Sequence, residues 1–360
     1  MKTLTDLVST LFAKAPDKNR VVGIDIGSSS MKVVEVQNRN NILTLTTYGE
    51  IQLGPYTNHA VGESVTLDAK QEQQALVDIL RESAVKAESA VFAMPLSSSF
   101  VTTIKFTADE KEDLTARVRV EARKYIPVPI NEVTLDWAEV STADSTKEKG
   151  QRDVLVAAIQ NDALSRFKVL MQFVNLKQPP TEIECFSAIR AAFSTEEQHV
   201  AVIDVGAVST KLYLAKDGLL QRMHRVRAGG AVATKRIAEA LDMSFQDAEV
   251  LKREVTKDHP QFRDIQRAHH SCYERPLLEF TQVIREYESE MGVEISAVYL
   301  AGSGALFNSF KQFVADTLEH EVSFLNPFTK VAYPAFMEDM TSELGPTFHV
   351  ALGAALRMFE

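Results

Sequence analysis

Apolar residues along this chain gather in short runs, and most of these runs have the length and composition of β-strands. Two of them, 21–26 and 200–205, are almost unbroken, which is typical of a buried strand. Each run ends in Asp-x-Gly, continues through small hydroxylated residues to a lysine, and then enters a second β-rich stretch. The pattern therefore predicts one strand–turn–strand unit used twice, in two parts of the chain that are far apart.

The turns of these two units have residues that suit a phosphate group. A Gly directly after a strand lets the backbone turn tightly and brings N–H groups close to an anion, and Ser and Thr hydroxyls add donors. An Asp does not favour a phosphate by itself, so its expected role is to hold a hydrated Mg²⁺, which takes only one or two carboxylates. One such turn alone would more simply be an ordinary β-turn. Two copies with the same flanking strands favour a shared phosphate-binding role.

A third glycine-rich turn lies late in the chain. A short strand at 294–301 runs into Gly-Ser-Gly at 302–304 and then into a predicted helix that passes through Leu318. This order suits a nucleotide that lies against a loop at a helix N-terminus. Phe307 stands where a dinucleotide fingerprint has its third Gly, and no P-loop pattern occurs, so the sequence argues against both of those nucleotide-binding classes.

The stretch between the two copies has a different pattern and predicts an inserted β-α-β-β-α module. After a strand at 90–94, its strands and helices are expected at 100–106, 108–125, 133–140, 154–159 and 161–174, with a polar surface loop at 141–151. Trp137, the only tryptophan, falls on one of these strands and is interpreted as a core or groove aromatic.

The first 15 residues predict an amphipathic helix, because their leucines and Phe12 recur at helical spacing. A helix packed on the protein body is the favoured interpretation. A helix that binds a partner or a membrane surface is the alternative, although its two lysines are few for anionic lipid. The chain shows neither an apolar run long enough to span a bilayer nor a signal-peptide pattern, so we expect a protein that is neither spanning nor exported.

Composition narrows the class of protein further. A length of 360 residues predicts at least two lobes, and 24% charged with 45% hydrophobic residues is typical of a globular chain. With 39 Lys and Arg against 49 Asp and Glu, the net charge of −10 argues against nucleic acid as a ligand. The two cysteines, Cys185 and Cys272, show no disulfide or zinc pattern, which points to a reducing cytosol.

A histidine-rich stretch at 258–272 invites a metal-site interpretation, since it also includes Cys272. The ligand spacing is poor, because His269 and His270 are adjacent and cannot share one helical face. A polar surface segment is the interpretation that we adopt.

Phrases along the chain resemble the actin, Hsp70 and sugar-kinase superfamily. They are the two Asp-x-Gly turns, Gly-Gly at 229–230 before a helix, Ala-Glu-x-x-Lys at 248–252, and Ala-Gly-Ser-Gly at 301–304. Within it the chain resembles the PilM family of type IV pilus assembly, itself similar to the cell-division protein FtsA. More specific phrases are Arg-Lys-Tyr-Ile-Pro-Val-Pro at 123–129, Leu-Asp-Trp at 135–137, Asn-Pro-Phe at 326–328 and Val-Ala-Leu-Gly-Ala-Ala-Leu-Arg at 350–357. The resemblance covers about residue 20 to the C-terminus.

The resemblance implies an α/β, actin-like (ribonuclease H-like), two-lobed ATPase fold with an inserted subdomain of the FtsA and PilM type. The expected division is 1–19 as an N-terminal amphipathic segment, 20–94 and 179–203 as lobe I, 95–178 as the inserted subdomain, and 204–360 as lobe II with a helical subdomain at about 232–292.

The resemblance also implies the residues that bind ATP and Mg²⁺. Those expected to bind the nucleotide are Asp25, Gly27, Ser28, Ser29, Ser30 and Lys32 in the first turn, Asp204, Gly206, Ser209 and Thr210 in the second, and Gly230, Glu249, Lys252, Gly302, Ser303 and Gly304 towards the nucleoside. Asp25 and Asp204 are the implied Mg²⁺ ligands, and Glu184 is the implied residue that orients the attacking water. For Glu249 and Lys252 the alternative is an ordinary solvated helix face.

The second turn departs from the pattern of actin-like hydrolases. Ala207 and Val208 stand where those proteins have glycines, and Lys211 replaces their last Asp. Bulkier side chains limit how near the backbone can come to a phosphate, so ATP binding is better supported than turnover, and we expect at most slow ATPase activity.

The function implied by the resemblance is a cytoplasmic scaffold of the pilus inner-membrane platform, serving pilus biogenesis and twitching motility. Its partner would be the cytoplasmic N-terminal tail of a PilN-like membrane protein, docked beside the inserted module and tuned by nucleotide. Other platform and motor components are further implied partners, homo-oligomerisation is left open, and association with the inner membrane would be indirect. Groove residues are not assigned, because apolar positions such as Ile126 and Val128 suit a core equally well.

Other interpretations stay open from sequence. They are an FtsA-like membrane-associated filament protein, the equivalent scaffold of a type II-like secretion system, a small-molecule kinase of the same superfamily, and a nucleotide-free interaction domain.

Overall fold

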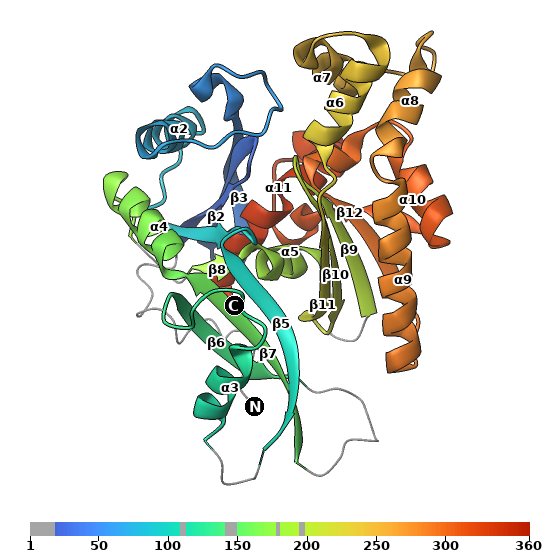
Figure 1. Cartoon of the computed structure of the whole chain (residues 1–360). Helices are drawn as coiled ribbons and strands as arrows, with labels where there is room; N and C mark the ends of the chain where they lie inside the picture. Colours follow the sequence, from blue (N-terminus) through green and yellow to red (C-terminus); the bar gives the residue numbers. More distant parts are fainter. Residues whose placement is uncertain (1–18, 109–112, 141–149, 178–180, 194–198) are drawn as a thin grey trace.

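Two five-stranded sheets of the same topology form the centre of the molecule (Figure 1). The structure is a computed structural model, and it describes residues 19–108, 113–140, 150–177, 181–193 and 199–360. The first sheet has the order β3-β2-β1-β4-β8 and the second has the order β11-β10-β9-β12-β13. In both, three antiparallel strands are followed by two parallel ones. The duplication expected from the sequence is therefore a duplication of whole sheets.

The strand bounds show where each copy begins. In the first sheet they are β1 (Arg20–Ile26), β2 (Ser30–Arg39), β3 (Ile42–Gln52), β4 (Ser89–Met94) and β8 (Glu182–Ile183). In the second they are β9 (His199–Val205), β10 (Thr210–Lys216), β11 (Leu219–Val226), β12 (Ala297–Ala301) and β13 (Val322–Phe324). The expected boundary between residues 203 and 204 falls inside β9. The second sheet begins by His199, because β9 pairs with β10 and β12 along its whole length.

Helices α5 (Glu184–Ala192) and α11 (Thr341–Leu356) lie between the two sheets (Figure 1). Small residues let them approach closely: a Cβ at Gly353 would overlap the carbonyl oxygen of Ser187 on α5, and a Cβ at Gly23 on β1 would overlap that of Ala351. Nearly every residue of α11 after Leu344 is buried. Helix α11 is thus a core element that joins the two lobes.

A three-stranded sheet, β5-β7-β6, forms the inserted module. Its elements are β5 (Ser99–Thr107), α3 (Leu114–Ala122), β6 (Val133–Glu139), β7 (Gln151–Gln160) and α4 (Asn161–Phe173), in the order expected from the sequence. Trp137 packs against the core of this sheet. Helix α3 is shorter than the predicted 108–125, because the Asp113 side chain caps its first turn by accepting from the backbone N–H groups of Thr115 and Ala116.

Five helices of the second lobe follow its first three strands in the chain: α6 (Gly230–Leu241), α7 (Phe245–Glu254), α8 (Phe262–Ser271), α9 (Glu274–Met291) and α10 (Phe310–Leu318). The interpretation of 258–272 as a polar surface segment is wrong. Helical spacing puts Phe262, Ile265 and His269 on the buried face of α8, and the His269 ring stacks on Phe307 with centroids 3.9 Å apart.

The remaining helix of the first lobe is α2 (Ala69–Glu82), and a capping box at Asp68 stabilises its first turn.

Two sequence expectations lie outside the described residues: the N-terminal amphipathic helix and most of the polar loop at 141–151. No helix in the described part of the chain is long and apolar enough to cross a bilayer.

Candidate functional site

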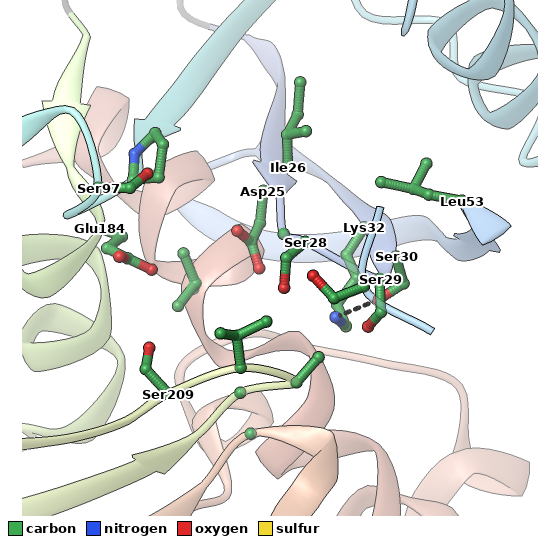
Figure 2. A pocket seen from close by; sticks show the side chains of 18 of the residues that line it. Asp25, Ile26, Ser28, Ser29, Ser30, Lys32, Leu53, Ser97, Glu184 and Ser209 are labelled. Carbon is green, nitrogen blue, oxygen red and sulfur yellow. Dashed lines mark hydrogen bonds between the residues drawn. The ribbon is translucent and has the colours of Figure 1, made fainter. Parts of the chain in front are cut away.

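A cavity of about 460 Å³ lies where the ends of the two sheets face each other. Twelve of the residues expected from the sequence line it: Asp25, Gly27, Ser28, Ser29, Ser30, Lys32, Glu184, Asp204, Gly206, Ser209, Gly302 and Ser303. Figure 2 shows Asp25 and the serines of the first turn directed into this space, with Glu184 beside it and Ser209 on the opposite turn. The fold thus brings together the two turns that the sequence repeats.

The two turns have the same backbone construction. The N–H of Gly27 donates to the carbonyl of Ser30, and that of Gly206 donates to the carbonyl of Ser209, both at 3.0 Å. A Cβ would lie 3.0 Å from the Ser30 oxygen at Gly27 and 3.1 Å from the Ser209 oxygen at Gly206. Such contacts are tighter than a side chain normally makes, so the tight turn explains the glycine in each copy.

The first turn presents donors to the cavity. The carbonyl oxygen of Ser28 accepts from the N–H of Val65, and that of Ser29 accepts from the N–H of Leu53. The N–H groups of Ser28 and Ser29 have no acceptor among the described residues. Successive N–H groups left free at a turn form a concave site for an anion.

The second turn is held from behind by other loops. Its carbonyl oxygens at Gly206 and Ala207 accept from the N–H groups of Gly230 and Ala231 at the start of α6, both at 2.9 Å. Gly302, with φ +83°, lies so close that a Cβ there would overlap the carbonyl oxygen of Val205. The glycine pair before α6 and the late Gly-Ser-Gly therefore position this turn.

Strand pairing places charged residues in a matching row on each lobe. Neighbours across β1, β2 and β3 are Asp25, Lys32 and Glu50, and neighbours across β9, β10 and β11 are Asp204, Lys211 and Arg225. The two rows agree in their first two members and differ in the third.

In lobe I the lysine turns away from the aspartate. The Nζ of Lys32 donates to the Ser30 hydroxyl at 2.8 Å and pairs with Glu50 at 3.4 Å. Asp25 is half-buried and makes no hydrogen bond or ion pair with any described residue. Burial raises the pKa of the Asp25 carboxyl to about 6; Lys32 opposes this shift and Glu184 adds to it. Asp25 is thus a carboxylate with free oxygens on the cavity wall.

In lobe II the lysine turns towards the aspartate. The buried Nζ of Lys211 donates to Glu184 Oε2 at 2.7 Å and to Asp204 Oδ2 at 3.1 Å. The other oxygen of Glu184 accepts from the N–H of Leu96 at 2.7 Å. Burial opposes the charge on Lys211, yet the two carboxylates raise its pKa above the ordinary value. Burial likewise opposes the charge on Asp204, but Lys211, with His349 second, holds the pKa of Asp204 below its ordinary value.

The two expected Mg²⁺ ligands therefore differ in how well they fit a metal. Among the described residues no group of three or more His, Cys, Asp or Glu side chains could hold a metal ion. A site built on one carboxylate, with phosphate and water oxygens, suits Mg²⁺, and Asp25 fits that description. Asp204 does not, because one oxygen is bonded to Lys211 and the other faces His349 Nε2 at 3.8 Å.

The cavity also has charged residues that the sequence did not indicate. Arg225 on β11 donates from Nε to the Ser209 hydroxyl at 3.2 Å. Arg166 on α4 of the inserted module pairs with buried Glu72 on α2. His349 on α11 is buried and completes the wall. No local motif marks these residues: Arg225 reaches the cavity from the strand beside Lys211, and Arg166 and His349 come from segments far along the chain.

Five expected residues lie outside the cavity wall, in the layer behind the second turn: Thr210, Gly230, Glu249, Lys252 and Gly304. The Thr210 hydroxyl donates to the carbonyl of Ala228 at 2.7 Å. The Lys252 ammonium donates to Glu249 Oε2 at 2.7 Å and to the Gly230 carbonyl at 3.1 Å. These contacts place Glu249 and Lys252 beside the start of α6 and against each other rather than on an open helix face.

Comparison with known proteins gives matches over nearly the whole chain. The family model described as type IV pilus assembly protein PilM matches residues 23–359. A solved PilM–PilN type IV pilus biogenesis complex has a TM-score of 0.78 at 24% identity and covers 94% of this chain and 98% of that chain. Ethanolamine utilization protein EutJ from Carboxydothermus hydrogenoformans has a TM-score of 0.55 at 16% identity, covering 98% and 95%. MreB5 of Spiroplasma citri bound to AMPPNP has a TM-score of 0.52 at 12% identity, covering 95% and 96%. These likenesses confirm the actin-like two-lobed fold.

Proposed function

This chain belongs to the PilM family of type IV pilus assembly proteins, and on that premise we propose that it is an ATP-binding scaffold of the pilus assembly platform. ATP would bind in the cavity between the lobes, and bound nucleotide would adjust the docking of the cytoplasmic tail of a PilN-like membrane protein. The solved complex of PilM with PilN supports a partner of this kind. Membrane association would then come through that partner.

The observation that supports ATP binding most strongly is the pair of equivalent turns that face one cavity from two lobes. A triphosphate between them would be bound from both sides, by free N–H groups and serine hydroxyls of the first turn and by the second turn opposite. Its binding energy would favour the conformation in which the lobes are close together. MreB5, whose solved structure has the same fold, is bound to AMPPNP.

The side chains of the cavity suggest distinct roles towards ATP. Lys32 and Arg225 would neutralise phosphate oxygens, and Gly302 and Ser303 would face the nucleoside. Asp25 would hold Mg²⁺, which when bound neutralises charge on the phosphates.

Slow turnover, if any, is expected from the contacts of Glu184. Both of its oxygens already accept a hydrogen bond, one from Lys211 and one from Leu96. Each oxygen keeps a second lone pair for a water molecule, but the Lys211 ammonium already draws on the negative charge that would activate that water. The proposal is therefore a nucleotide-binding protein with at most slow ATPase activity.

Calorimetry of ATP binding tests the site. We expect Arg225→Ala to raise the Kd for ATP by about threefold to tenfold, because a charge-assisted contact to phosphate is lost. Arg222→Ala is the matched control: it lies on the same strand, and its guanidinium pairs with Glu290 at 2.6 Å. Absence of ATP binding by the wild-type protein would contradict the proposed function.

The docking step needs its own measurement. A labelled peptide from the cytoplasmic tail of a PilN-like protein encoded beside this gene can be titrated with the protein, with and without ATP. We expect binding whose affinity changes when ATP is present. Equal affinity in both conditions would contradict nucleotide-tuned docking, and no binding at all would contradict the docking role.

A further inference from the structure

We propose that Lys211 is the resident cation of this site, occupying the place between Asp204 and Glu184 where a divalent ion would otherwise be needed. As a result, nucleotide would bind with little dependence on Mg²⁺. This inference rests on the proposed ATP binding and goes beyond it, since it names what neutralises the acidic half of the cavity.

The geometry at Lys211 is that of a cation shared by two carboxylates. Its Nζ lies 2.7 Å from Glu184 Oε2 and 3.1 Å from Asp204 Oδ2. Glu184 is the first residue of α5, which lies between the lobes, whereas Asp204 is the penultimate residue of β9 in the second sheet. One ammonium group therefore links two elements that meet at the cavity.

The position of Lys211 is imposed by strand pairing. Lys211 on β10 is the direct partner of Asp204 on β9, so the side chains of the two residues start on the same face of the sheet. All three side chains are nearly buried: Lys211 is 11% exposed, Glu184 is 10% exposed and Asp204 is 6% exposed. A buried ammonium between two buried carboxylates is held there, because turning away would leave both acids without a counter-charge.

The charges around the cavity are balanced once Lys211 is included. Four acidic side chains of the described wall, Asp25, Glu72, Glu184 and Asp204, stand against four basic ones, Lys32, Arg166, Lys211 and Arg225. Without Lys211 the acidic groups would be in excess and would repel a polyphosphate. In other sites of this chemistry a divalent cation offsets such an excess; here the protein contributes the positive charge itself.

In the first lobe the equivalent lysine does not bond to the aspartate. Lys32 occupies the equivalent place on β2, but its Nζ bonds to Ser30 and lies near Glu50, which leaves the Asp25 carboxylate free. A Mg²⁺ that accompanies ATP can therefore bind at Asp25 without displacing any protein group. Mg²⁺ at Asp25 would add a positive charge to a cavity in which Lys211 already neutralises Asp204 and Glu184.

The decisive measurement is the Kd for AMPPNP, determined by calorimetry with Mg²⁺ and with excess EDTA. For the wild-type protein we expect the two values to agree within about tenfold. For Lys211→Met we expect the ratio of Kd in EDTA to Kd in Mg²⁺ to rise by about tenfold or more, since two buried carboxylates then lack a cation. Lys216→Met, the same change on the same strand outside the cavity wall, should keep the wild-type ratio.

A larger dependence on Mg²⁺ in the wild-type protein would overturn the inference, and so would an unchanged ratio in Lys211→Met. The wild-type comparison needs no variant, so the inference stays testable even if Lys211→Met folds poorly.

A second measurement needs no nucleotide. Thermal unfolding of the nucleotide-free proteins should show that millimolar Mg²⁺ raises the Tm of Lys211→Met, because the ion replaces the missing ammonium between Asp204 and Glu184. The Tm of the wild-type protein and of Lys216→Met should not rise. Absence of a rise in Lys211→Met would overturn the inference. If the wild-type protein binds no ATP but Lys211→Met gains this Mg²⁺ effect, the proposed function fails while the assignment of Lys211 stands.

Discussion

Two aspartates in equivalent positions of a duplicated turn have opposite electrostatic states, and the cause lies in single side chains. Asp204 is bonded to a lysine, and its pKa is held below the ordinary value although burial opposes this. Asp25 has no such partner among the described residues, and burial raises its pKa to about 6. The direction in which Lys32 or Lys211 turns thus decides which carboxylate can accept an ion.

The raised pKa of Asp25 predicts a pH dependence of folding. The folded protein binds this proton more tightly than the unfolded chain does, so stability falls as pH rises from about 4 to about 6. Asp25→Asn removes the free-energy cost of burying an ionised carboxylate at this position. We expect it to stabilise the nucleotide-free protein by about 1 to 2 kcal/mol at neutral pH, and by less at about pH 4. Urea unfolding at both pH values measures the difference. The exposed Asp339→Asn is the control, and equal stability of Asp25→Asn and wild type at neutral pH would refute this account.

At the scale of elements, the joint between the lobes depends on helices that meet almost backbone to backbone. At the crossing of α5 and α11, Gly353 lies against the carbonyl of Ser187, and Gly23 brings β1 equally close to α11 at Ala351. Close crossings of this kind leave no room for a methyl group. The glycines explain why the sequence near the C-terminus is rich in small residues where an amphipathic surface helix would have polar ones.

Substitution at this crossing tests its tightness. We expect Gly353→Ala to lower the free energy of unfolding by about 1 to 3 kcal/mol, because the added Cβ would overlap backbone atoms that cannot move aside cheaply. Chemical denaturation measures the change. Ser342→Ala, at an exposed position of the same helix, should leave stability nearly unchanged. A Gly353→Ala protein as stable as wild type would show that the helices can separate at little cost.

At the scale of the whole molecule, the two lobes also touch at a point away from the joint. Gly62, in the loop between η1 (Gly54–Thr57) and α2 of the first lobe, has φ +84°, and a Cβ there would lie 2.6 Å from Glu249 Cδ on α7 of the second. Its N–H donates to the Gln52 side chain at 3.2 Å. This contact, and the α5–α11 joint, hold the lobes on either side of the cavity.

Widening the lobe contact should speed nucleotide exchange. Gly62→Ala adds a methyl group against Glu249, and we expect ATP to dissociate about threefold to tenfold faster as the lobes separate more readily. Stopped-flow release of a fluorescent ATP analogue measures the rate. Gly218→Ala is a matched control, since Gly218 has a similar φ of +74° but nothing within 4 Å of its added Cβ. Equal acceleration in both variants would assign the effect to backbone strain alone.

Local features of the fold and site were predictable because they depend on neighbours in the chain. The two Asp-x-Gly turns, their flanking strands, and the elements of the inserted module except the length of α3 follow from apolar runs, turn residues and their repetition. The interpretation of 258–272 was wrong, and the boundary expected at 203/204 falls inside a strand, for the opposite reason. His269 is buried by Phe307, which lies far along the chain, and β9 belongs to the second sheet because of its partners.

The sequence by itself determined that this protein has two copies of a phosphate-type turn, an acidic globular chain around them, and the residue types of an actin-like site. Only the tertiary structure decided how those residues are used. It turned Lys211 onto Asp204 and Glu184, brought Arg225 and Arg166 to the cavity, and placed Glu249 behind the second turn. The physical reason is that turn geometry arises within a few residues, whereas charge pairing and burial depend on segments that only the packed lobes bring together.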